Sequence, residues 1–326
     1  MKEFILILII LSLSFYSLED EDTSYSMILN QVKIDKVKQI YSHLPKRTSV
    51  NILKMCNLMN KEIESNSLND YEAVYLVYYW IGQNIEVDCT NYNVRYESPV
   101  NAFNTGKSSY VGIATLFSTM VSNLGHESNI IEGDLKRIEN NNKGEIVAEI
   151  AHIWNYVLID KKYYLFDPTL GAGSCDNKFR KYYSDVFFGT DPNYFVRTHF
   201  PSNSTWQLLD TPVEKEKFQS WPYINKFFYL DGFKTVTPDV NNITIHENLE
   251  IILTYDKSRD IVVSCNKVVY NGKYIHSDHT YFQLSNGVLK VWFKGNEKMD
   301  NFIIYAKPRY DKTSYAVVIY KVNNKQ

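Results

Sequence analysis

The sequence predicts an α+β protein in which helices come first and antiparallel strands follow. Up to about residue 124, apolar residues recur at helical spacing, whereas from residue 126 onward they alternate with polar residues in short runs. Turn pairs such as Asn271-Gly272 and Asn286-Gly287 separate the later runs, which is typical of a β-sandwich.

Four helices are expected before the first strand. Residues 28–39 and 50–64 carry the first two apolar stripes, and Asn69-Asp70 is a capping signal for a third helix over 71–84. A loop is expected over 87–109. Ser108 and Ser109 can cap the fourth helix, and Gly125 ends it.

The strands fall into an early and a late group. The early strands are expected at 126–135, 148–159 and 163–167, with a hairpin turn at Asp160-Lys161-Lys162. Residues 170–220 are irregular and rich in aromatic side chains. The late strands are expected at 242–255, 261–269, 279–284, 288–293, 301–306 and 315–322.

The first residues resemble a secretory leader. Phe4 to Phe15 form an apolar run broken only by two serines, and an acidic stretch follows directly. We therefore expect a signal peptide at 1–18, a first domain at 19–226 and a β-sandwich-like domain at 227–326. A buried first helix or an uncleaved anchor is the alternative for the leader. The expected location is the secretory pathway, the cell surface or the medium, with no stable membrane span once the leader is removed.

Composition excludes several classes of partner. The chain has 326 residues and a net charge of −2, which gives no basis for nucleic-acid binding. The sequence holds no CxxC motif and no EF-hand spacing, and its histidines are scattered. No cofactor and no metal are therefore expected.

Cysteines and sequons agree with secretion. The sequons are Asn203-Ser204-Thr205 and Asn242-Ile243-Thr244. An even number of cysteines permits one or two disulfides, and the sequence leaves their pairing open. The four cysteines are Cys56, Cys89, Cys175 and Cys265.

Two residues, a histidine and an aspartate, are candidates for a catalytic pair. His152 lies within one expected strand, and Asp167 ends the next. With an even-numbered hairpin loop, both side chains face the same side of the sheet. A two-residue loop centred on Lys161-Lys162 leaves them several residues apart, so contact requires a different register or a bulge. An aspartate that accepts a hydrogen bond from a histidine fixes its tautomer, as in a Cys-His-Asp triad.

The order of short motifs is similar to the transglutaminase-like superfamily, specifically to the group related to the kyphoscoliosis peptidase. The motifs are Tyr79-Trp80-Ile81 with Asn84-Ile85, Gly112-Ile113-Ala114 with Leu116-Phe117, His152-Ile153-Trp154-Asn155, and Asp167-Pro168-Thr169 with Gly171-Ala172-Gly173. Downstream follow Phe187-Phe188, Asp191-Pro192, Phe195, His199-Phe200-Pro201 and Trp206-Gln207-Leu208-Leu209. The resemblance covers residues 70–220 and implies a papain-like core.

The resemblance also implies where the nucleophile should stand. The cysteine motif of the family is C-x-G-Y-A, which falls on Tyr110-Val111-Gly112-Ile113-Ala114. Tyr110 then occupies the position of the catalytic cysteine, while His152 and Asp167 match the base and its partner. Ser109 is a poor substitute, because one step along a helix turns a side chain by about 100°. A thiol displaced to Cys89 or Cys175 is the other possibility.

These residues lead to three hypotheses. The first is a secreted pseudoenzyme that binds a peptide, a protein or a surface glycan, with His152 and Asp167 kept for structural reasons. His199 and Trp206 are expected to belong to the framework. The second is an active hydrolase or acyl transferase with a serine or displaced cysteine nucleophile. In the third, the β-sandwich alone binds, and deleting the residues after 227 would test it.

Overall fold

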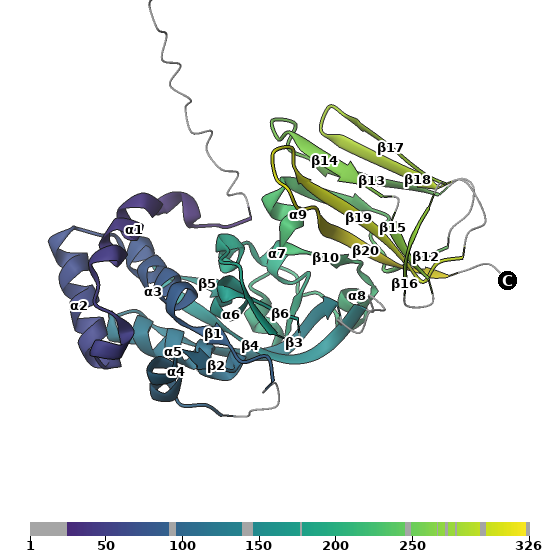
Figure 1. The fold of residues 1–326 in the computed structure, drawn as a ribbon. Helices are drawn as coiled ribbons and strands as arrows, with labels where there is room; N and C mark the ends of the chain where they lie inside the picture. The colour runs from purple at the N-terminus through teal and green to yellow at the C-terminus, as the bar shows by residue number, and fades with distance from the viewer. Residues whose placement is uncertain are drawn as a thin grey trace, which may run out of the picture.

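The structure is a computed structural model that describes residues 25–90, 96–138, 146–176, 178–244, 249–265, 267–270, 273–277, 279–293 and 298–323. The expected signal peptide lies outside these residues. Within the described part of the chain, no helix is long and apolar enough to cross a membrane. The predicted α+β class is confirmed, with helices before the first large sheet and antiparallel strands after it (Figure 1).

The chain forms two lobes: the first contains the helices and the first large sheet, and the second contains the C-terminal strands. Helices form one side of the first lobe (Figure 1). They are α1 (Ile34–His43), α2 (Ile52–Ser65), α3 (Asp70–Asn84), α4 (Pro99–Thr105) and α5 (Tyr110–Asn123). Asn69 and Glu72 form a capping box at the start of α3, where a capping signal was expected. The first helix begins later than predicted, because residues 29–31 form a 3-10 turn instead.

A short helix lies inside the segment that was predicted to be a loop. α4 begins after Ser98, whose side chain caps it, and carries Pro99 in its first turn. Gly106 ends it with a φ of 72°, a left-handed conformation that glycine adopts at little cost. A helix of one to two turns has too few apolar positions for a periodic signal, which is why the sequence pattern missed it.

A five-stranded antiparallel sheet carries the predicted functional residues. Its order is β8-β5-β4-β3-β9. The strands are β3 (Ser128–Ile138), β4 (Ile146–Ile159), β5 (Lys162–Phe166), β8 (Phe188–Thr190) and β9 (His199–Pro201). α5 packs on this sheet, where Phe117 meets Phe166 with ring centroids 5.6 Å apart and the Asn155 side chain donates to the Ala114 carbonyl. The start of α5 therefore lies against the middle of β4.

Short elements connect the sheet to the rest of the chain. They are β1 (Glu86–Val87), β2 (Lys107–Ser108), α6 (Pro168–Ala172), β6 (Gly173–Asp176), β7 (Lys178–Lys181), α7 (Pro192–Phe195), α8 (Lys215–Ser220), β10 (Tyr223–Ile224) and α9 (Lys226–Leu230).

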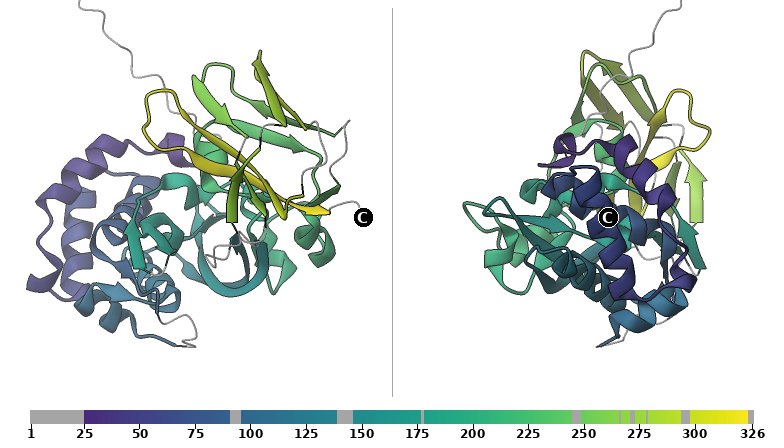
Figure 2. Two further views of the ribbon diagram at one scale, coloured as in Figure 1. Left: turned by 45° about the vertical axis from the view of Figure 1, so that its right-hand side comes forward. Right: turned by 90° about the vertical axis from the view of Figure 1, so that its left-hand side faces the viewer.

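The C-terminal part consists of two sheets (Figure 2), in which all strand pairs are antiparallel except β12 with β20, which is parallel. One has the order β11-β13-β18-β17, and the other β10-β20-β19-β15-β16 with β12 on β20 and β14 on β19. The strands are β11 (Phe233–Thr237), β12 (Asn242–Thr244), β13 (Glu250–Tyr255), β14 (Ile261–Ser264), β15 (Lys267–Tyr270), β16 (Lys273–His276), β17 (Thr280–Ser285), β18 (Val288–Phe293), β19 (Asn301–Pro308) and β20 (Tyr315–Asn323). Ile251, Val291 and Phe302 line a shared apolar space.

Two predicted strands are wrong as single elements. The run 242–255 contains β12 and β13, which belong to different sheets, and the run 261–269 contains β14 and β15. Apolar residues keep the same two-residue phase on both sides of each break, and only the short polar runs His246-Glu247-Asn248 and Asn266-Lys267 interrupt it, so the period alone does not separate the strands. The division at residue 227 stays a prediction, and β10, just before it, already pairs with β20.

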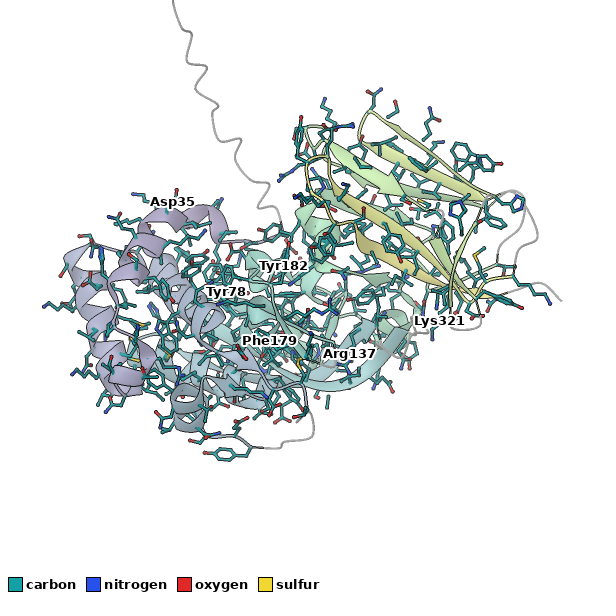
Figure 3. All side chains as sticks on the ribbon, viewed as in Figure 1. Asp35, Tyr78, Arg137, Phe179, Tyr182 and Lys321 are labelled. Atoms are coloured by element: carbon teal, nitrogen blue, oxygen red, sulfur yellow. A yellow bond between two sulfur atoms is a disulfide. The ribbon has the colours of Figure 1, made fainter. Side chains whose placement is uncertain are left out.

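Two groups of side chains join the lobes. Tyr182, labelled in Figure 3 where the lobes meet, contacts the rings of Phe227 and Tyr315. Arg197 makes two hydrogen bonds of 2.8 and 2.6 Å with the carboxylate of Asp239, beyond β11. The same guanidinium lies 4.2 Å from the ring centre of Trp221. We call Arg197, Asp239 and Trp221 the clasp.

Candidate functional site

His152 and Asp167 are in direct contact beneath the start of α5. His152 lies on β4, and its Nε2 is 2.7 Å from Asp167 Oδ2. The two side chains are 5% and 0% exposed, so water screens this contact little. Asp167 follows β5 and caps α6, because its Oδ1 accepts a hydrogen bond of 2.9 Å from the Leu170 N–H.

The hairpin explains how two residues far apart in sequence meet. Its turn is Asp160-Lys161, with φ values of 49° and 64°, which is typical of a two-residue hairpin. Pairing runs without a bulge up to Asn155 and Phe166, and Asp167 is the next residue. It falls diagonally across from His152 on the same face, a separation that side chains span. The predicted need for a different register is confirmed, because the turn lies one residue earlier than Lys161-Lys162, and no bulge is required.

A second histidine shares the same carboxylate. His199 on β9 places its Nε2 3.1 Å from Asp167 Oδ2 and its Nδ1 2.9 Å from Thr198 Oγ1. Its ring stacks on Phe195, with centroids 3.9 Å apart. From the sequence, His199 is expected only in the framework. Its one signal was the His199-Phe200-Pro201 motif, since the strand that carries it reaches Asp167 only through sheet pairing with β3.

The surroundings shift the pKa values of Asp167 and His199 below their ordinary values. Burial disfavours ionisation of Asp167, but the electrostatic interaction with His152 and hydrogen bonds from both histidines outweigh burial and hold the Asp167 pKa well below its usual range. Burial lowers the pKa of His199 below its ordinary value, despite the hydrogen bond to Asp167. At neutral pH the site therefore contains a carboxylate and a neutral His199.

Tyr110 borders His152 from the helix side. It is the first residue of α5 and is 7% exposed, and its ring centroid lies 5.2 Å from that of His152. Burial raises the pKa of the Tyr110 phenol. The phenol is therefore protonated at neutral pH and is a poor nucleophile.

Ser109 is turned to another partner. As the cap of α5, its Oγ donates a hydrogen bond of 2.6 Å to Glu97 Oε2 and accepts one of 3.4 Å from the Gly112 N–H. The Ser109 N–H also donates to Glu97, at 2.9 Å. Burial of Glu97 raises its pKa, but the hydrogen bonds from Ser109 outweigh burial and leave that pKa below its ordinary value. The Ser109 hydroxyl thus serves the helix cap.

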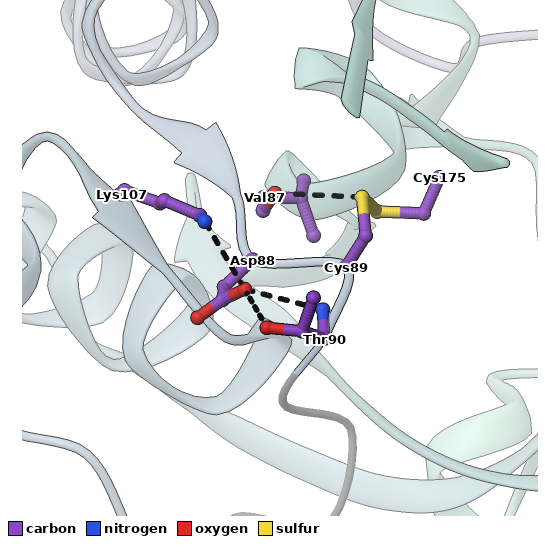
Figure 4. The surroundings of a disulfide bond; sticks show 6 residues. All are labelled: Val87, Asp88, Cys89, Thr90, Lys107 and Cys175. Carbon is purple, nitrogen blue, oxygen red and sulfur yellow. Dashed lines mark hydrogen bonds and ion pairs between the residues drawn. A yellow bond between two sulfur atoms is a disulfide. The ribbon is translucent and has the colours of Figure 1, made fainter. Parts of the chain in front are cut away.

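Two of the four cysteines form a disulfide, and the other two are free and buried. Cys89 and Cys175 form a disulfide between the segment after β1 and strand β6, drawn in Figure 4. Cys56 and Cys265 are free and buried, and burial raises the pKa of Cys56 to about 11. Cys89 and Cys175, considered as displaced nucleophiles, therefore carry no free thiol in this structure.

The comparisons with known proteins agree with the motif order. The profile of the transglutaminase-like superfamily matches residues 58–168. The kyphoscoliosis peptidase of Mus musculus is 27% identical over 202 residues, 60% of this chain and 31% of the relative. That of Homo sapiens is 29% identical over 180 residues, 53% of this chain and 27% of the relative.

A more distant match is the cytokinesis protein 3 of Schizosaccharomyces pombe, 23% identical over 200 residues, 60% of this chain and 22% of that protein. The chain thus aligns with less than a third of the length of each of these relatives. Residues 58–168 are thus similar to the core of the transglutaminase-like superfamily, and more than half of the chain is similar to the kyphoscoliosis peptidases.

Proposed function

We propose that this protein is a non-catalytic member of the transglutaminase-like superfamily that acts by binding. The observation that carries the proposal is Tyr110, which stands where the cysteine motif falls on this sequence and whose ring lies against His152. A buried phenol beside the base cannot replace a thiolate, because its pKa is raised rather than lowered.

Other potential nucleophiles are engaged elsewhere. Ser109 donates to Glu97, and Cys89 is bonded to Cys175. The His152–Asp167 pair then has a structural role: two buried, mutually hydrogen-bonded groups are costly to separate even when no reaction depends on them.

The proposed setting is outside the cell or at its surface or wall, with a protein, a peptide or a surface glycan as ligand. The apolar leader, the exposed sequon residues Asn203 and Asn242, and the disulfide support this setting, since disulfides persist in oxidising compartments.

One observation favours a second candidate function. The 2.7 Å contact between His152 and Asp167 is the geometry that orients a general base. An active hydrolase or acyl transferase would use this pair with Ser109 released from Glu97 as its nucleophile.

The test is an assay of the full chain for peptide hydrolysis and for amine incorporation into glutamine-containing peptides. We expect neither activity. Turnover that disappears in both His152→Ala and Ser109→Ala, with the fold retained by circular dichroism, would establish the second function instead. Ser108→Ala is the matched control, because it removes a neighbouring hydroxyl while Ser109 keeps its own hydrogen bonds to Glu97 and Gly112.

A further inference from the structure

Three metal-ligating atoms converge at the candidate site. His152 Nε2, Asp167 Oδ2 and His199 Nε2 all lie within 4.8 Å of one another. Their side chains are 5%, 0% and 0% exposed. They come from β4, from the residue that follows β5 and from β9, all parts of one sheet, so the backbone holds all three in place.

In Asp167 and His199, the polar atom that points away from the cluster already has a hydrogen-bond partner. Metal-binding side chains are usually held by such partners. Asp167 Oδ1 accepts from the Leu170 N–H, which leaves Oδ2, the oxygen in contact with both histidines, as the coordinating atom. His199 Nδ1 lies 2.9 Å from Thr198 Oγ1. A histidine that binds a metal through Nε2 must carry its proton on Nδ1, and a hydroxyl oxygen there can accept it.

We propose that His152, Asp167 and His199 bind one Zn²⁺ ion, with water as a fourth ligand. Two imidazoles and one carboxylate are ligands that zinc accepts in tetrahedral sites, and nitrogen donors disfavour Mg²⁺ and Ca²⁺. Zinc bonds of roughly 2.0–2.2 Å place neighbouring ligand atoms about 3.3 Å apart. The distances from Asp167 Oδ2 to His152 Nε2 and to His199 Nε2, now 2.7 and 3.1 Å, would therefore increase by a few tenths of an ångström.

Binding exchanges hydrogen bonds for coordination. Without metal, both Nε2–H groups donate to the carboxylate. With metal, each histidine moves its proton to Nδ1 and offers the Nε2 lone pair, so these two shifts require no net proton release. His152 is then unable to act as a base, because Nε2 is coordinated and Nδ1 is protonated. The proposal therefore goes beyond the non-catalytic function and is compatible with it.

The test is calorimetric titration of the full, untagged chain with Zn²⁺, together with Co²⁺ binding followed by its visible absorption. We expect one Zn²⁺ per chain and a tetrahedral Co²⁺ spectrum without thiolate charge-transfer bands. His199→Gln and Asp167→Asn should each weaken zinc binding by about 100-fold or more, and Thr198→Val by about 10-fold, with Thr198→Ser close to wild type. His43→Gln, at an exposed histidine on α1, is the matched control and should bind as wild type does.

Two results would overturn the proposal: wild-type protein that takes up no Zn²⁺, or stoichiometric binding that His199→Gln and Thr198→Val leave unchanged. Circular dichroism checks that each variant is folded, and Thr198→Val remains informative if a ligand variant is not. Because these experiments measure metal binding and not activity, a result against the zinc site is distinguishable from a result against the proposed non-catalytic function.

Discussion

Tyr110 occupies a position whose electrostatics suit an anion better than a phenol. The first turn of a helix presents free N–H groups and the positive end of the helix dipole, which lower the pKa of a thiol placed there. Burial works in the opposite direction on the Tyr110 phenol. The start of α5 thus provides surroundings that would activate a cysteine, but the residue at that position is a tyrosine, whose phenol stays protonated.

Replacing this residue by cysteine tests those surroundings. In Tyr110→Cys we expect the new thiol to have a pKa below the ordinary value of about 8.5 and to react with iodoacetamide at neutral pH. Alkylation would be followed by mass spectrometry. Adding His152→Ala should slow the reaction, because the neighbouring imidazole no longer stabilises the thiolate. Cys56 and Cys265, both buried, should stay unmodified in the same samples. A rate equal to that of free cysteine and independent of His152 would contradict this prediction.

His199 should make the protein sensitive to mild acid. Its folded pKa is lowered by burial, whereas in the unfolded chain it is about 6.5. Below that value the unfolded state takes up a proton that the folded state resists, so stability falls as pH falls, with a slope approaching about 1.4 kcal/mol per pH unit. The lowered pKa of Asp167 acts with the same sign, but only below about 3.8.

Urea unfolding at a series of pH values between about 7 and 5 checks this. His199→Gln should flatten the curve, while His43→Gln, at an exposed position, should keep the wild-type slope. Equal slopes in all three proteins would show that His199 does not resist protonation.

The site could be anticipated only in part, for a physical reason. His152 and Asp167 belong to one hairpin, and the two-residue period of strands places them on one face from sequence alone. His199 reaches Asp167 through β9, whose position depends on pairing with β3 rather than on any local pattern. The link between Ser109 and Glu97 was likewise invisible, because Glu97 lies in an irregular segment before α4.

At the scale of elements, Gly133 allows β9 to approach β3. An added Cβ there would lie 2.2 Å from the Phe200 carbonyl oxygen, 2.5 Å from a ring atom of Trp154 and 2.7 Å from Pro201 Cα. Two of these are backbone atoms, so the neighbouring strand itself would have to move. Because β9 carries His199, this close approach also sets the position of the second histidine.

Gly133→Ala should therefore lower the free energy of unfolding by about 1–3 kcal/mol and weaken the pH dependence that His199 confers. Urea denaturation at two pH values measures both effects. Gly125→Ala is the comparison: its cost arises from a φ of 95°, with open space around the new methyl group, and it should leave the pH dependence intact. A Gly133→Ala protein as stable as wild type would show that the sheet yields without cost.

Prediction of secondary structure succeeded where several sequence signals agreed, and it failed where it depended on a single signal. The start of α3 has both a capping box and an apolar stripe. By contrast, the split between β12 and β13 separates two sheets, although the apolar residues keep the same two-residue phase on both sides of it. Which sheet a short strand joins is decided by contacts far along the chain.

Over the whole molecule, the clasp connects the strand of His199 to the second lobe. Arg197 stands two positions before the start of β9 and holds Asp239 through two charged hydrogen bonds while its guanidinium lies over the ring of Trp221. A partly buried, bidentate pair of this kind contributes more than an exposed one.

Asp239→Asn should lower stability by about 1.5–3 kcal/mol and make the two lobes unfold less cooperatively, because the guanidinium loses its charged partner. Differential scanning calorimetry would show a broadened or divided transition. The exposed Arg309–Asp260 pair provides the control, since Asp260→Asn should cost under about 1 kcal/mol and keep a single transition. Equal effects of the two substitutions would argue against the clasp.

The disulfide between Cys89 and Cys175 closes a covalent ring, with its two ends 86 positions apart in sequence. Ser109, Tyr110, His152 and Asp167 all lie within that ring, whereas His199 lies outside it. A protease that cuts once inside the ring leaves these four residues tethered until the disulfide is reduced. A cut between residues 176 and 198 detaches the chain that carries His199, so the two histidines of the site differ in how they survive cleavage.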